Sequence, residues 1–346
     1  MASTPLTPLS SLMFLGELAR LSFTAQTATV FSIVTGGATV FSNTYYPDDN
    51  GMITVYDLDR LLEPHIGELH ADFTFKAATS TLGPATIKVF RCRWGVDTTA
   101  ANFIPSHFLT PMQGTRDTLD GRHETLSLYS TASEEAYAEC RYYRDGSIST
   151  ARVSLGTGSG ARLLNVSPGR FVNATKGRLF AYTVVCGARR ASYRVLAYRG
   201  ETADAFIFRN CFNAWEVLYL SGTRETNPQY TRSSAHIGGY LRNYLIKEEV
   251  TRRSFTGPLP EGMEAVAMNL ADSQAVFFLL PNGDAGEEVA VTDCDLKHDN
   301  TDSLTDLNFS YRGAALTYRL ADDRTARLRV PRPPRIFDDT FDQSYE

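Results

Sequence analysis

The chain has 346 residues, of which 43% are hydrophobic, 11% aromatic and 21% charged. This length is too great for one compact sandwich and predicts two or three domains, each able to bury a core without metal or disulfide staples. The formal net charge of −5 is too small to drive binding to nucleic acid or to an anionic membrane, so neither is an expected partner.

The cysteines and the apolar runs bear on the cellular compartment. The five cysteines are widely spaced, odd in number and without a Cys-x-x-Cys pair, which is typical of reduced thiols in a cytosolic product. The apolar patch at residues 12–15 lacks a basic flank and is followed by Gly16-Glu17, which argues against a signal peptide. No run approaches the roughly 18 apolar residues of a membrane span. We therefore expect neither an export signal nor membrane insertion.

The first predicted domain covers residues 1–130 and reads as a β-sandwich. Gly36-Gly37 predicts a hairpin turn, and Asp57 or Asp59 predicts the cap of a short helix over DRLLEPHI. Six or more short strands within about 130 residues is the spacing expected of a sandwich. The runs that alternate apolar with polar or small residues are ELARLSFTAQ, ATVFSIVTGG, ATVFSNTYY, MITVYDL, ELHADFTFKA, ATIKVFRCRW and GRHETLSLYS.

The middle segment, residues 131–201, is also predicted to be β-rich. EAYAECRYYR and SISTARVSL flank Asp145-Gly146, which predicts a tight turn, and RLFAYTVVCG and ASYRVLAYRG flank a hairpin loop at Gly187–Arg190. The pattern leaves open whether these strands extend the first sandwich or form an independent insert.

The third predicted domain covers residues 202–325 and contains one helix among strands. In PLPEGMEAVAMNLADS, Pro260 is placed for a first helical turn and apolar residues recur at helical spacing, which predicts a helix near residues 260–272. The tail, residues 326–346, contains prolines, ends on acidic residues and is predicted to be extended. The expected fold is mainly β, with two or three antiparallel β-sandwich-like domains and a single helix packed on the C-terminal sheet.

Three stretches look like chemical motifs but are interpreted as structural. GRHETLSLY lacks the second zinc ligand of a zincin, because Ser127 stands four residues after His123. GTGSGAR lacks the ending of a phosphate loop and predicts a flexible hairpin loop. VTDCDLKHDNTDSL gathers possible ligands between Asp293 and Asp302, but Lys297 and His298 do not fit a calcium loop, so a polar turn with at most an adventitious metal is predicted.

No catalytic, cofactor-binding or metal-binding residue is assigned, and no enzymatic activity is expected. The chain contains no G-x-S-x-G elbow for a serine nucleophile. A carboxylate pair of the glycosidase kind is not excluded by sequence, since 39 residues are acidic.

The stretch around Trp215 concentrates the candidate residues. In AWEVLYL, alternation places Trp215 and Tyr219 on one face of a strand, where core packing explains the tryptophan. Cys211 lies in a bend without a neighbouring base, which argues against an activated thiolate. The arginines either stay solvated or pair with acids on another copy of the chain. The candidate core or assembly residues are Trp215, Tyr219, Arg224, Tyr230, Arg232, Arg242 and Tyr244.

Several stretches of the chain resemble a known group of proteins. FRNCFNAWE, YTRSSAHIGG, LRNYLIKEE, VTDCDLKHDNTDSLTDLNFSYR and YYPDDNGMITVYDLDRLLE are similar to tail-region proteins that prophages of gut Bacteroidales encode near the tape-measure gene. The resemblance covers roughly residues 40–65 and 205–312. It implies a structural component of the tail tip or baseplate, assembled in the bacterial cytoplasm, that forms a ring or hub with its own copies and other tail proteins and carries no catalysis.

The alternative from another class is a glycan-binding adhesin or receptor-binding tip protein built on β-sandwiches. The positions of the aromatic residues distinguish the two. If Trp94, Trp215 and the tyrosines are buried or at subunit contacts, assembly is favoured; if two or three line an exposed groove with amides and carboxylates, a cell-surface glycan is favoured. A hidden hydrolase would instead need an isolated carboxylate pair in a deep cleft.

Overall fold

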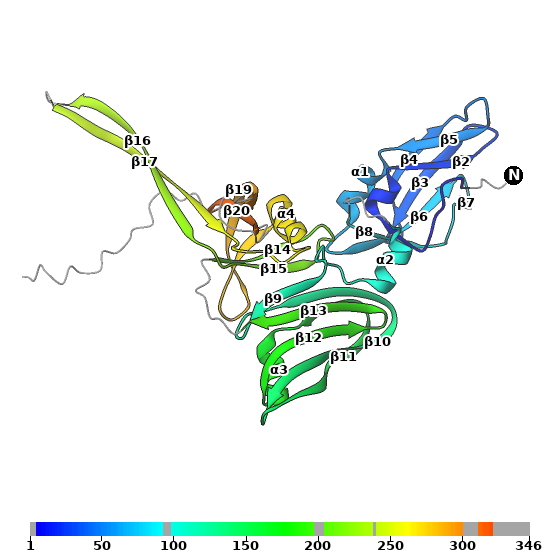
Figure 1. The fold of residues 1–346 in the computed structure, drawn as a ribbon. Coiled ribbons are helices and arrows are strands. Elements are labelled where there is room, and N and C mark those ends of the chain that lie inside the picture. Colours follow the sequence, from blue (N-terminus) through cyan, green and yellow to red (C-terminus); the bar gives the residue numbers. More distant parts are fainter. Residues whose placement is uncertain (1–4, 93–97, 197–203, 238–239, 300–310, 321–346) are drawn as a thin grey trace, which may run out of the picture.

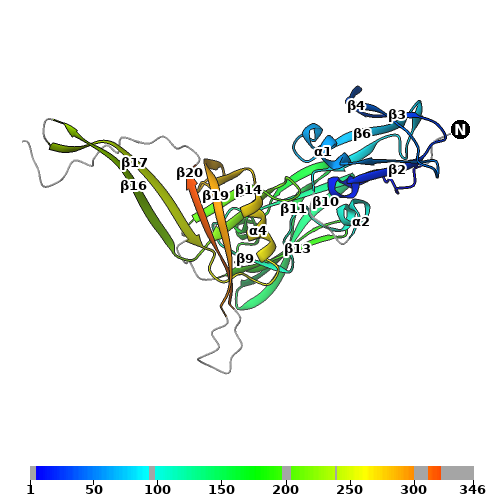
Figure 2. The ribbon, with the colours of Figure 1, turned by 90° about the horizontal axis from the view of Figure 1, so that it is seen from above.

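The computed structural model describes residues 5–92, 98–196, 204–237, 240–299 and 311–320. It shows a mainly β protein in which the described residues form four sheets arranged in three lobes along the chain, and a long hairpin projects from the third lobe (Figures 1 and 2). Most strand pairs are antiparallel; β1–β8 and β13–β9 are parallel. The predicted fold class is confirmed.

The N-terminal lobe is a two-layer sandwich. One layer is a sheet in the order β1-β8-β6-β3-β4, with β7 beside β6, and the other is the β2–β5 pair. Its core joins the layers, as in the stacked rings of Phe23 and Phe31, whose centroids lie 5.9 Å apart. Its elements are β1 Leu12–Phe14, a 3-10 turn Leu15–Leu18, β2 Arg20–Thr24, β3 Thr29–Thr35, β4 Ala38–Tyr45, β5 Met52–Tyr56, α1 Leu58–Leu62, a 3-10 turn Glu63–His65, β6 His70–Ala77, β7 Ser80–Thr81 and β8 Ile87–Phe90.

Two local predictions in this lobe have clear outcomes. The Gly36-Gly37 turn is confirmed: it joins β3 to β4, and both glycines have positive φ, 55° and 81°, as a two-residue hairpin turn requires. Asp57 stands at the N-terminus of α1 as predicted, but its backbone is left-handed (φ 53°) and its side chain makes no capping hydrogen bond. α1 packs beside the 3-10 turn that precedes β2.

The middle lobe is a separate five-stranded sheet in the order β11-β10-β12-β13-β9, with α3 packed on it. Phe171 of α3 meets Tyr182 of β12 with ring centroids 4.8 Å apart. The Asp145-Gly146 turn between β10 and β11 is confirmed by the pairing of Arg144 with Ser147. Its elements are α2 Ala100–Ser106, which leads into the lobe, β9 Thr115–Leu119, β10 Thr125–Arg144, β11 Ser147–Asn165, α3 Pro168–Thr175, β12 Arg178–Cys186 and β13 Arg189–Leu196.

The predicted boundary between residues 130 and 131 is wrong, because it falls inside β10. GRHETLSLYS and EAYAECRYYR form one strand of 20 residues. Ser130 pairs with Gly160 and Glu134 with Gly158, so residues 131–133 form a bulge where the sequence looks like a break. The middle sheet therefore includes β9 and begins at Thr115.

The prediction of a hairpin loop at GTGSGAR is also wrong, because this stretch lies within β11. Gly156 and Gly160 take positive φ values of 103° and 76°, which bend the strand without ending it. The guanidinium of Arg162 donates hydrogen bonds to the carbonyl oxygens of Gly156 and Glu134, both at 2.8 Å. A side chain within the same strand thus satisfies backbone groups that the bulges leave unpaired.

The C-terminal lobe is a seven-stranded sheet in the order β15-β14-β18-β19-β20-β17-β16, with α4 packed on it. Phe206, Leu218 and Leu270 belong to the core between them. The elements are β14 Asp204–Arg209, β15 Trp215–Leu220, β16 Arg224–Ile237, β17 Tyr240–Phe255, α4 Glu264–Asp272, β18 Val276–Leu279, β19 Ala285–Asp299 and β20 Tyr311–Leu320.

Two predictions in this lobe need correction. The helix predicted near residues 260–272 exists, but it begins at Glu264, because Gly262 with φ 86° turns the chain ahead of it. A Cβ at Gly262 would lie 2.4 Å from the carbonyl oxygen of Gln113, so the close approach requires glycine. The polar turn predicted from Asp293 is instead strand β19, in which Asp293 pairs with Thr317. Asp302 lies outside the described residues.

The three lobes share one apolar contact region. It combines strands of the N-terminal sheet, α2, β10 and the turn after β14, and it includes Phe14, Phe90, Ile104, Tyr129 and Phe212. Within the described ranges, no helix is long and apolar enough to cross a membrane.

Candidate functional site

The β16–β17 hairpin is the most prominent surface feature of the molecule. Its two strands pair from Arg224↔Ser254 to Ile237↔Tyr240, whereas β20 pairs with β17 only from Arg252 to Phe255. The rest of the hairpin extends away from the lobes as a two-stranded ribbon (Figures 1 and 2). At about 3.3 Å per residue, β16 alone spans roughly 45 Å.

Most described side chains of β16 lie open to solvent. Every residue of β16 from Arg224 to Arg232 is exposed. Tyr230 is 52% exposed, and Tyr240 and Leu241 at the far end are 70% and 67% exposed. The guanidinium of Arg232 lies 5.9 Å from the centre of the Tyr230 ring. A ribbon with large aromatic and apolar side chains in solvent presents a surface that a partner can cover.

A buried carboxylate anchors the base of the hairpin to the lobe. Asp204 of β14, 7% exposed, accepts hydrogen bonds from Tyr318 of β20 (2.6 Å) and from the hydroxyl of Ser254 on β17. The guanidinium of Arg224 on β16 donates to the second oxygen of Asp204 at 3.2 Å. One side chain thereby connects three strands to β14 at the point where the ribbon leaves the body.

The structure divides the predicted site residues between two places. Arg224, Tyr230 and Arg232 lie on the hairpin, whereas Trp215 and Tyr219 lie in β15 at the opposite margin of the sheet. Trp215 is half-buried between the guanidinium of Arg209, 3.8 Å from the centre of its ring, and the ring of Phe277. The residues that Trp215 packs against are therefore Arg209 and Phe277. Arg242 and Tyr244 lie in β17, but their side chains are outside the described part of the structure, as is all of Trp94.

Tyr219 belongs to the contact between the middle and C-terminal lobes. Its hydroxyl donates to the backbone oxygen of His123 (3.0 Å) and accepts from the amide of His123 (2.7 Å). The guanidinium of Arg122 lies over its ring at 4.4 Å. Tyr219 therefore joins the two lobes through its contacts with His123 and Arg122.

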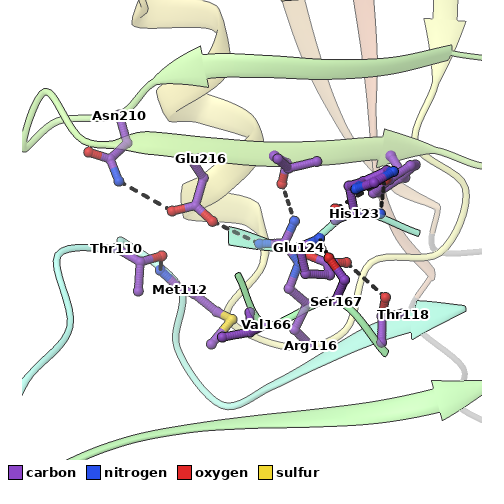
Figure 3. Close-up of polar contacts among 12 residues, drawn as sticks. Thr110, Met112, Arg116, Thr118, His123, Glu124, Val166, Ser167, Asn210 and Glu216 are labelled. Atoms are coloured by element: carbon purple, nitrogen blue, oxygen red, sulfur yellow. Dashed lines mark hydrogen bonds and ion pairs between the residues drawn. The ribbon is translucent and has the colours of Figure 1, made fainter. Parts of the chain in front are cut away.

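Beside Tyr219 lies a buried charged cluster, the junction cluster, made of Arg116, Glu124 and Glu216 (Figure 3). Arg116 of β9 contacts Glu216 of β15 at 2.7 Å and Glu124, just before β10, at 3.1 Å, and each of the three side chains is at most 3% exposed. The guanidinium also donates to the backbone oxygen of Val217. One cation thus holds two carboxylates, one from each lobe.

Neutral groups complete the junction cluster. Thr118 donates to Glu124 at 2.8 Å, and the side-chain amide of Asn210 donates to Glu216 at 3.2 Å and to the backbone oxygen of Leu109 at 2.9 Å. Buried carboxylates that are both paired and hydrogen-bonded are tolerated in a protein interior. No local sequence pattern indicates this cluster, because Arg116 and Glu216 are 100 positions apart.

The charges of the junction cluster shift one another's pKa. Burial disfavours charge on Arg116, but the carboxylates of Glu124 and Glu216 outweigh it, so the pKa of Arg116 is raised. Burial raises the pKa of Glu124, although Arg116 and the hydrogen bond from Thr118 act in the opposite direction. Burial also raises the pKa of Tyr219. Glu124 is therefore the group of this cluster whose ionisation opposes folding.

The raised pKa of Glu124 predicts a pH dependence of stability. An acid whose pKa is higher in the folded chain than in the unfolded chain holds more protons when folded, so its contribution to the free energy of unfolding increases as the pH falls through the folded pKa and levels off below about 4.3. We expect the difference in unfolding free energy between the natural chain and Glu124→Gln to grow in favour of the natural chain as the pH falls, by at most about 1.4 kcal/mol per pH unit. Urea unfolding at a series of pH values measures it; a constant difference would contradict the prediction.

Cys140, Cys211 and Cys294 are poor nucleophiles at neutral pH. Burial raises the pKa of Cys140 to about 12 and that of Cys294 to about 11. The contact with Cys92 and, next, burial raise the pKa of Cys211. Each remains protonated, which agrees with the interpretation of Cys211 as a structural residue of the bend.

Among the residues that the structure describes, no three or more His, Cys, Asp or Glu side chains are grouped to hold a metal ion. Only part of the predicted Asp293–Asp302 stretch is described, with Asp293 and Asp295 exposed on β19.

No protein-family model and no curated protein matches the sequence of this chain.

Proposed function

We propose that this chain is a structural protein that assembles through the β16–β17 hairpin, as a component of a phage tail tip or baseplate. The observation that carries the proposal is the projecting ribbon, with its exposed β16 side chains and its buried anchor at Asp204. An isolated two-stranded hairpin is marginally stable in water, and a third strand or a packed face is needed to stabilise it. A neighbouring subunit would supply that surface.

The composition of the ribbon supports a protein partner. Tyrosine and arginine are enriched in the centres of protein interfaces, and Tyr230 and Arg232 stand together on β16. Its polar residues, such as Asn227 and Gln229, provide hydrogen-bonding groups for a rim. The placement of this surface in a phage tail rests on the sequence resemblance, with copies of the chain and other tail proteins as its partners in the virion.

The glycan-binding alternative receives less support from the positions of the aromatics. The most exposed tyrosines are spread over separate parts of the molecule: Tyr46 and Tyr56 on the N-terminal lobe, Tyr143 on the middle lobe, and Tyr230 and Tyr240 on the hairpin. Trp215 is covered by Arg209. A glycan array is the direct measurement for this alternative.

The hairpin proposal predicts a specific loss of assembly. The double variant Tyr230→Ser/Arg232→Ser should weaken self-association or association with tail proteins on the order of tenfold or more, since such residues concentrate interface free energy. Light scattering over a range of concentrations and salt measures the assembly mass.

The matched control is Tyr143→Ser/Arg144→Ser. These residues are a similarly exposed tyrosine–arginine pair, 50% for Tyr143 and 53% for the Arg144 side chain, on the hairpin of the middle lobe. Both double variants should keep the thermal stability of the natural chain. Equal assembly by the hairpin variant and the natural chain, or equal loss in both variants, would contradict the proposal.

A further inference from the structure

The outer edge of the N-terminal sheet is open along β4. β4 ends the strand order and, in the described part of the chain, pairs only with β3 (Figure 2). The amide of Thr44 turns away from β3 and donates to the side chain of Asn43. Alternate amides and carbonyls of an antiparallel strand point the same way, so β4 presents a row of backbone groups outward. Such a row is a template for another strand.

This edge lacks the features that protect other edge strands. β16 carries Arg224, Glu225 and Pro228, and β11 carries Arg152 and Arg162. Charges and proline on an edge strand discourage strand addition. β4 has neither, and the whole stretch 21–47 contains no Asp, Glu, Lys, Arg or His.

The geometry of β4 leaves a regular segment for pairing. The register with β3 shifts between Ile33↔Phe41 and Val34↔Thr39, so a bulge occupies the first part of the strand. Residues 41–45 pair regularly, and Ser42, Asn43 and Thr44 are exposed. Tyr46, 78% exposed, directly follows. The available edge therefore combines outward backbone groups with a large side chain in solvent, and the Thr44 amide would exchange its bond to the Asn43 side chain for one to the added strand.

The absence of charge indicates the occupant. When an edge strand pairs with its own copy about a two-fold axis, each residue faces itself or a near neighbour, so a charge near the axis would face a like charge. A strand of different sequence would impose no such restriction, because opposite charges could be matched. An uncharged edge avoids like-charge contacts at the axis without any matching of signs beside it, which favours a second copy as the occupant.

We propose that β4 pairs antiparallel with β4 of a second copy of this chain, with the two-fold axis near Asn43, so that the two N-terminal sheets form one continuous sheet. This contact is separate from the hairpin and goes beyond the assembly proposed for it. Together, a two-fold contact at one end and a hairpin at the other would let dimers link into larger structures.

Charge substitutions at the edge test self-pairing. Ser42→Lys/Thr44→Lys and Ser42→Glu/Thr44→Glu are each added to Tyr230→Ser/Arg232→Ser, so that the hairpin contact does not contribute. Each should be monomeric where the Tyr230→Ser/Arg232→Ser parent is a dimer in sedimentation or light scattering, because like charges then face each other across the axis. An equal mixture of the two variants should restore the dimer. A control, Thr150→Lys/Ser154→Lys on the edge strand β11, should not change the mass.

Each other outcome overturns the proposal. The result would show that β4 does not pair with itself if the natural chain stays monomeric or if the variants of a single charge sign stay dimeric. A mixture of the two variants that stays monomeric would show the same and would point to another segment or partner on this edge. The Tyr230→Ser/Arg232→Ser variant should keep the β4 dimer. A failure of the hairpin proposal is therefore distinguishable from a failure of this one.

Discussion

Replacing Arg116 by methionine is expected to destabilise the folded chain by about 3–5 kcal/mol, as breaking a buried ion pair from one side usually does. The change leaves the carboxylates of Glu124 and Glu216 buried at the junction between two lobes without their shared cation. Their remaining hydrogen bonds, from Thr118 and Asn210, do not neutralise charge. Denaturant unfolding at neutral pH measures the loss.

A matched control uses an exposed arginine on the adjacent strand. Arg194 of β13 contacts Asp117 of β9 at 2.7 Å, but its side chain is 60% exposed, so Arg194→Met should cost less than about 1 kcal/mol. Adding Glu124→Gln and Glu216→Gln to Arg116→Met removes the uncompensated charges and should recover much of the stability. Equal costs for the two arginine variants, or no recovery in the triple variant, would show that the charges are not what makes Arg116 important.

The loss should also depend on pH. As the pH falls, Glu124 takes up a proton more readily than an exposed carboxylate would, because burial already raises its pKa. The difference between Arg116→Met and the natural chain should therefore shrink in mild acid. A loss caused only by missing packing of the arginine side chain would not change with pH.

The sequence predicted the local elements well, because their signals are local. Gly36-Gly37 and Asp145-Gly146 are hairpin turns, since each pair takes the positive φ that such turns need. The apolar spacing after Gly262 located α4 to within a few residues. A period of two along most strands was enough to indicate a mainly β protein.

The errors occurred where a turn-like composition lies inside a strand. Gly156 and Gly160 look like a loop, but Arg162 satisfies the carbonyls at the bulge and β11 continues. The bulge at residues 131–133 likewise hid the continuity of β10. Single-sequence patterns do not show which side chain will complete a backbone bond.

The candidate site was only partly accessible to sequence reasoning. The arginines and tyrosines of β16 were identified by composition, but their projection from the body depends on where β20 stops pairing with β17. Asp204 and Tyr318 are 114 positions apart, and no local pattern links them. The hydroxyl groups that Asp204 contacts come from distant strands. No sequence spacing therefore predicts that this aspartate is buried and hydrogen-bonded.

Replacing Asp204 by alanine is expected to loosen the base of the hairpin and to cost about 3 kcal/mol, because the buried hydroxyls of Ser254 and Tyr318 lose their acceptor. Hydrogen exchange should show reduced protection in β16 and β17 before the core of the middle lobe changes. Asp295→Ala is the matched control: Asp295 contacts Arg253 of the same hairpin at 3.4 Å but is 50% exposed, and its loss should cost less than about 1 kcal/mol.

The same substitution separates anchoring from packing. Adding Ser254→Ala and Tyr318→Phe to Asp204→Ala removes the unpaired hydroxyls while keeping the Tyr318 ring in its contacts with Phe206 and Phe278, and should recover a large part of the stability. Assembly should still be weakened in this triple variant, because the ribbon has lost the carboxylate that fixes its direction. Restored stability with unchanged assembly would mean that Asp204 serves the fold alone and that the direction of the hairpin is set by strand pairing.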